Sequence, residues 1–229
     1  AIDLLLHGDP KAAKTQLGGL LDEYRNDEGL SAYARQKLYD VQETLGTITD
    51  DDALLRQTAS ELSSVMQDGS WTEHGRSNLH RQIGDCYRYA REWEMAVGAY
   101  KAAIALDGRL ICRIHLAECF LYQKEIKQAV CQIEAVPIEE LDEPGMMDFI
   151  FTYSAISIWS ERIEMLEKAQ AWLKALKASE PLFDQRRLNR LVRVTETAAK
   201  GIATSEAKAD SAPEGGIAGA SRALMLQPN

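Results

Sequence analysis

The sequence lacks the features that mark several large classes of protein. No apolar run approaches the roughly 18 residues of a membrane span, and residues 1–9 carry neither the basic residues nor the cleavage site of a secretion signal. The phosphate-binding motifs GxxxxGK[ST] and GxGxxG, the zinc motif HExxH and the nucleophile motif GxSxG are all missing. We therefore expect no membrane partner, no cofactor, no catalytic residues and no enzymatic activity.

Cysteine is scarce, and no two cysteines form a CxxC pair. The four are Cys86, Cys112, Cys119 and Cys131, all in helical contexts, which is typical of reduced thiols in a cytoplasmic protein. Cys112, His115 and Cys119 are spaced so that they would share one helix face as metal ligands. Since no fourth ligand is evident, we favour thiols packed between helices and expect no metal.

Basic residues are outnumbered by acidic ones, 26 to 35, which gives a formal net charge of −9. This balance argues against nucleic acid as a partner. Arginines do gather in the segment QRRLNRLVR at residues 185–193, where they would contact phosphates or an acidic partner. A solvated face on a terminal helix is the interpretation we favour.

What the chain does have is apolar residues at helical spacing over almost its whole length, and no segment alternates like a half-buried strand. We expect helices at residues 1–7, 10–25, 29–46, 51–67, 73–90, 93–106, 110–123, 125–136, 146–160, 163–179 and 183–202. Short turns between them favour antiparallel hairpins. Residues 204–216 are small, polar and rich in Pro and Gly, so 204–229 is expected to be a flexible linker and tail.

A pattern of small and large residues recurs along the helices. Its first copy contains His80, Ile83, Gly84, Tyr87, Ala96, Tyr100, Ala103 and Gly108. A second copy, 33 residues on, contains Leu116, Ala117, Phe120, Ala129 and Ile133. A third contains Tyr153, Ile156, Ser157, Ala169, Leu173 and Pro181. The pattern resembles the tetratricopeptide repeat. In such hairpins small residues let two helices approach closely, and we assign the aromatic residues Tyr87, Trp93 and Tyr100 to the core around the crossing.

The resemblance implies an all-α fold, a right-handed α-solenoid of antiparallel helix hairpins over residues 1–203. The repeats are expected at 77–109, 110–141 and 146–181. Residues 183–202 are expected to form a C-terminal capping helix that covers the last apolar face. Exposed ends of such an array also favour self-association, so a homo-oligomer is a further prediction.

The resemblance also implies that the first helix of each repeat faces a concave groove. The groove residues it indicates are Asn78, Arg81, Asp85, Arg88, Tyr89, Ile111, Ile114, Glu118, Leu121 and Tyr122. Their mixture of charged and apolar side chains suits a peptide that carries acidic and apolar residues. The expected function is a non-enzymatic scaffold that binds a protein or peptide segment. The alternative is a regulatory domain of a larger multidomain protein, because the sequence opens on what looks like mid-helix.

Overall fold

The computed structural model describes residues 31–67, 71–179, 192–193 and 195–202, with isolated positions between 12 and 23. Every regular element in these residues is a helix, and none of these helices has the length and apolar character needed to cross a membrane. The chain divides into two compact units, residues 1–124 and 125–229.

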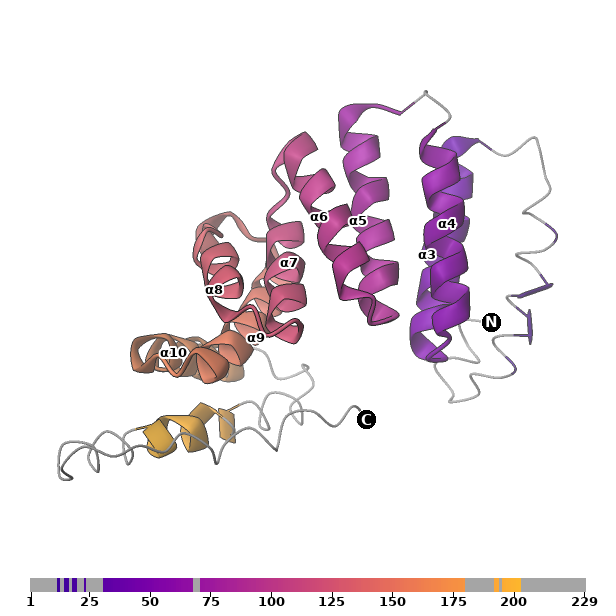
Figure 1. Cartoon of the computed structure of the whole chain (residues 1–229). Helices are drawn as coiled ribbons and strands as arrows, with labels where there is room; N and C mark the ends of the chain where they lie inside the picture. Colours follow the sequence, from indigo (N-terminus) through magenta and orange to yellow (C-terminus); the bar gives the residue numbers. More distant parts are fainter. Residues whose placement is uncertain are drawn as a thin grey trace. The chain divides into compact units, whose positions relative to one another are not determined.

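Residues 31–124, the continuously described part of the first unit apart from 68–70, contain five consecutive helices that each pack against the next (Figure 1). They are α3 (Ala32–Ile48), α4 (Asp52–Met66), α5 (Glu73–Tyr89), α6 (Trp93–Asp107) and α7 (Leu110–Tyr122). The second unit contains α8 (Ile126–Glu134), the 3-10 helix η1 (Ile138–Glu140), α9 (Glu143–Ser160) and α10 (Ile163–Ser179), and α9 packs against both α8 and α10. The boundary between the units falls between α7 and α8, inside the predicted repeat 110–141.

Local sequence accounts for where these helices begin and end. The hydroxyl of Thr72 accepts the backbone N–H of Gly75 at 3.1 Å and begins α5, as an N-cap residue does. Asp142 caps α9 in the same way at 2.9 Å, with Pro144 in the first turn. Gly108 ends α6 with a φ of 70°, the left-handed conformation that glycine adopts without a side-chain clash. The eight helices predicted between residues 29 and 179 are confirmed to within a few residues at each end.

A close helix approach in the first unit depends on a missing side chain. A Cβ atom at Gly84 would lie 2.6 Å from the ring of Tyr100, so the fully buried Tyr100 on α6 occupies the space that glycine leaves on α5. Ala96, Ala117 and Ala129, which occupy predicted small positions, are also fully buried. The small residues of the repeat pattern thus lie where helices pack closely, as the sequence predicts.

The second unit has an apolar core with many aromatic rings. The rings of Phe149, Tyr153 and Trp172 contact one another with centroids 4.9 to 5.5 Å apart. Ala169 and Leu173 of α10 are buried, as the third repeat predicts. The predicted capping helix at 183–202 and the tail at 204–229 lie largely outside the described residues, although 195–202 are helical.

Candidate functional site

The charged residues predicted to line the groove form a network of hydrogen bonds and ion pairs with one another. Asp85 of α5 lies at its centre and is only 3% exposed. Its Oδ1 accepts a hydrogen bond from the Tyr100 hydroxyl at 2.6 Å and lies 3.0 Å from His115 Nδ1. Its other oxygen forms an ion pair with Arg81, one turn earlier on α5. Asp85 therefore joins three consecutive helices of the first unit, α5, α6 and α7.

Arg88 extends this network along the same face. Its Nε donates to the Tyr100 hydroxyl at 3.2 Å, and its Nη1 donates to Glu118 Oε2 of α7 at 2.9 Å. The guanidinium also lies over the ring of Tyr89, 4.3 Å from the centroid. We call the following set the Asp85 cluster: Arg81, Asp85, Arg88, Tyr100, His115 and Glu118.

The electrostatics of the cluster follow from burial combined with close opposite charges. Burial acts to raise the pKa of Asp85, but the hydrogen bond from His115 and the charges of Arg81 and Arg88 outweigh it and hold the pKa well below its ordinary value. Glu43 on α3 behaves in the opposite way, because burial and the charge of Asp85 raise the pKa of its carboxyl to about 8. Asp85 is therefore ionised at neutral pH, whereas most of Glu43 is protonated.

The ten predicted groove residues divide into three groups by exposure. Asp85, Ile114 and Leu121 are buried and so offer little surface to a partner. Partly buried positions are Asn78, Arg81, Arg88, Ile111 and Glu118. Tyr89 and Tyr122 are exposed, at 37% and 48%. The two arginines already bind carboxylates of this chain, so the surface that a partner would meet is mainly aromatic.

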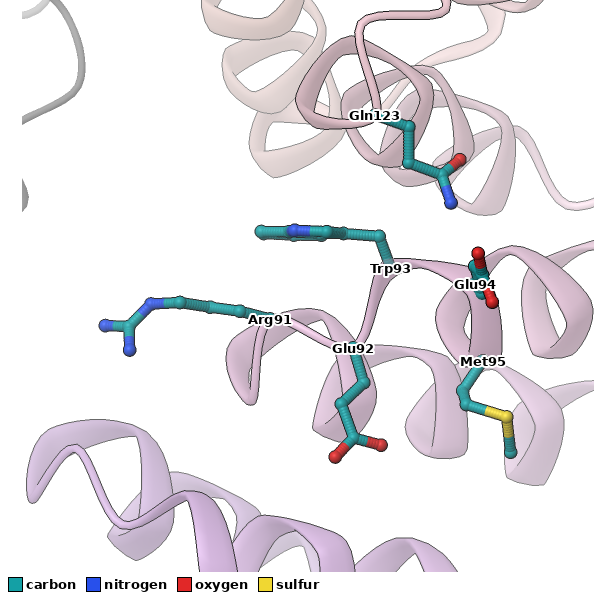
Figure 2. A pocket seen from close by; sticks show the side chains of 6 residues that line it. All are labelled: Arg91, Glu92, Trp93, Glu94, Met95 and Gln123. Carbon is teal, nitrogen blue, oxygen red and sulfur yellow. The ribbon is translucent and has the colours of Figure 1, made fainter.

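Tyr122 belongs to an aromatic stack that sequence reasoning missed. Its ring lies parallel to that of Trp93, with centroids 4.4 Å apart and an interplanar angle of 8°. Trp93 was predicted to be core but is only partly buried, because it begins α6 directly after the α5–α6 turn. A pocket of about 420 Å³ opens beside it (Figure 2). The pocket is lined by Arg91, Glu92, Trp93, Glu94, Met95 and Gln123.

The cysteine and histidine positions that suggested a metal alternative have other roles in this unit. His115 is bonded to Asp85, and burial raises the pKa of the Cys112 and Cys119 thiols to about 12. Both thiols are therefore predominantly protonated at neutral pH. Across the described part of the chain, no group of three or more His, Cys, Asp or Glu side chains is arranged to hold a metal ion.

Comparison with known proteins gives no family for the chain. No protein-family model matches it, and neither a curated protein nor a solved structure matches it at a significant level. The tetratricopeptide resemblance therefore stays a prediction from the sequence pattern.

Proposed function

We propose that the chain is a non-enzymatic protein-interaction module, a right-handed α-solenoid of tetratricopeptide-like hairpins closed by a C-terminal helix. It binds a segment of a partner protein on the face formed by the first helices of its hairpins, α5 and α7. We propose a helical-repeat protein because the residue pattern recurs along the sequence and because neighbouring helices within each unit pack against one another.

The observation that carries the proposal is the exposure of Tyr89 and Tyr122. They stand 33 residues apart, at equivalent positions of two consecutive repeats, and each is the last residue of its helix. Large exposed aromatic side chains contribute disproportionately to binding because they bury much area with little loss of rotamer freedom. Two such rings at matched positions support a binding surface along the ends of α5 and α7.

The Asp85 cluster supports the same proposal because it holds side chains next to the tyrosines in place. Arg88 is held by Tyr100 and Glu118, and Tyr89 lies against Arg88. Tyr122 is held by its stack with Trp93. Side chains that are fixed before binding lose less conformational entropy when a partner docks. The proposed partner segment therefore needs apolar or aromatic residues to cover the tyrosines, more than the acidic residues that the sequence suggested.

A random peptide display library selected on the purified chain tests the proposal. We expect it to yield binders whose affinity falls about tenfold or more in Tyr122→Ala, because the loss of an aromatic anchor costs ~2 kcal/mol. The matched control is Ile48→Ala, which removes another exposed apolar side chain of the same unit. Thermal melting checks that both variants stay folded. Selected peptides that bind Tyr122→Ala as tightly as the original chain would contradict the proposal.

A further inference from the structure

The pocket beside Trp93 is lined by aromatic, acidic, basic, amide and thioether side chains. Five of its six lining residues are consecutive, Arg91–Met95, and span the α5–α6 turn and the start of α6, while Gln123 comes from just beyond α7 (Figure 2). The lining combines an indole ring, two carboxylates, a thioether and an amide with one guanidinium. Met95 at the rim is 53% exposed.

The indole supplies a surface that attracts cations. Tyr122 covers one side of the Trp93 ring in the parallel stack, and the remaining indole surface contributes to the pocket wall. Tryptophan is the aromatic side chain that binds an ammonium or guanidinium group most strongly. The chain itself already uses this interaction nearby, since the Arg88 guanidinium lies over the Tyr89 ring.

The charges around the pocket favour the same kind of ligand. Arg91, which lines the pocket, forms an exposed ion pair with Asp50, with its guanidinium 3.1 Å from Oδ1. Glu92 pairs with Arg56 of α4, while the exposed Glu94 stands in the first turn of α6. Across the pocket and its ion-pair partners, three carboxylates therefore face two guanidinium groups. The excess of negative charge complements a cationic side chain.

We propose that this pocket binds a lysine or arginine side chain of the partner segment, whose neighbouring apolar residue packs on Met95 and Tyr122. This inference deepens the proposed function and rests on it. The ammonium or guanidinium lies against the indole of Trp93 and is attracted by the negative charge of the exposed Glu94. The aromatic surface then provides affinity, and the pocket selects basic segments over acidic ones.

Three peptides, each acetylated and amidated at its ends, test the inference. They share the same leucine and phenylalanine positions, and the remaining positions are all lysine in the first, all glutamine in the second and all glutamate in the third. Binding is followed by the indole N–H resonance of Trp93 in two-dimensional NMR spectra. Trp71 is the internal reference, since its Nε1 donates to the Val65 carbonyl oxygen at 3.0 Å. We expect the lysine peptide to shift the Trp93 resonance and to bind about fivefold more tightly than the glutamine peptide at low salt. Added salt removes most of that preference.

The variant Glu94→Gln isolates the contribution of the exposed carboxylate. We expect it to weaken binding of the lysine peptide about threefold and to leave binding of the glutamine peptide unchanged. The matched control is Glu167→Gln, which makes the same change of charge on the exposed side of α10 and should change neither affinity. Melting temperatures check that both variants fold.

The possible failures are distinguishable. If all three peptides bind equally and still lose affinity in Tyr122→Ala, the pocket does not select cations and the proposed function stands. If the lysine peptide leaves the Trp93 resonance unmoved, or Glu94→Gln binds it as before, the inference is overturned. If no peptide binds, the inference is also overturned. The proposed function is then tested by the peptide display selection alone.

Discussion

In the first unit, the carboxylate of Asp85 on α5 is bonded by side chains of α6 and α7. In the second unit, the buried serine hydroxyl groups of α9 bond within their own helix. Asp85 receives its bonds from Tyr100 on α6 and His115 on α7. The Ser154 hydroxyl instead donates to the Ile150 carbonyl of the same helix at 2.6 Å. A buried charge therefore constrains how neighbouring helices pack, while a self-satisfied hydroxyl leaves packing to apolar contacts.

The largest effect is expected from Asp85→Ala. Removing the carboxylate leaves the buried Tyr100 hydroxyl without its acceptor and the partly buried Arg81 without its carboxylate partner, which costs about 3–5 kcal/mol of unfolding free energy. Ser154→Ala in the second unit costs about 1 kcal/mol or less, because its hydroxyl bonds only to its own helix. Urea unfolding followed by the indole resonances of Trp71 and Trp172 reports on each unit separately. Equal losses in the two variants would remove the contrast between the units.

A smaller effect on the unfolding free energy is expected at one repeat position, which is occupied by glycine in the first unit and by serine in the second. Gly84 and Ser157 occupy the same small slot of the predicted repeat. Gly84→Ala puts a methyl group against the buried Tyr100 ring and costs about 1–3 kcal/mol through overpacking. Ser157→Ala should change stability by less than about 1 kcal/mol, because its hydroxyl donates within α9.

The control for this pair is Gly98→Ala on the exposed side of α6. A Cβ there meets no atom within 4 Å, so alanine should stabilise the helix by about 0.5–1 kcal/mol. Unfolding free energies of the three variants are compared under identical conditions. If Gly84→Ala also stabilises the chain, the close approach of α5 and α6 at Tyr100 is wrong.

A further contrast is a pH dependence that the first unit owes to Glu43. The raised pKa of Glu43 means that the folded chain keeps a proton that the unfolded chain releases, so stability falls as pH rises from about 4.5 to about 8. The groups that act on Glu43 are Asp85, Arg81, Asp40 and Arg88, on α5 and on α3 itself. Asp85, whose pKa is lowered, contributes stability above its ordinary pKa and loses it at acidic pH.

Glu43→Gln therefore should flatten the stability profile between pH 5 and pH 8 by at least about 1 kcal/mol. Urea midpoints of the Trp71 resonance across this range provide the measurement. Glu94→Gln, which removes an exposed carboxyl of the same unit, should keep the original slope. A profile that Glu43→Gln leaves unchanged would show that this carboxyl is solvated and ordinary in its titration.

The helices and their small-residue positions were predictable because they depend on local order along the chain. Periodic apolar residues predict α5 and α6 with their boundaries, and the spacing of Gly84 from Tyr87 and Ala96 indicates a hairpin. The tetratricopeptide resemblance implied that Tyr89 and Tyr122 line a groove, and both are exposed. That they line a groove stays a prediction.

The pairing of side chains across helices was not predictable in the same way. Asp85 and Arg88 were expected in an open groove, yet Asp85 bonds to residues 15 and 30 positions away and is buried. Glu43, Tyr100 and His115 carried no signal of their part in this network, because nothing in their local spacing encodes which helix will cross theirs. The helical spacing of apolar residues places Trp93 at a core position. Its position directly after a turn was the one sign in the sequence that its side chain would be partly exposed.

The sequence by itself thus determined an all-helical chain, the ends of its helices and the positions where two of them can approach closely, because hydrogen bonding, capping and apolar periodicity act over a few residues. The tertiary structure alone decided which charges are neutralised inside the first unit and which aromatic rings are left at its surface. The physical reason is that the free energy of a buried charge or an exposed ring depends on neighbours that are brought close only when the helices pack.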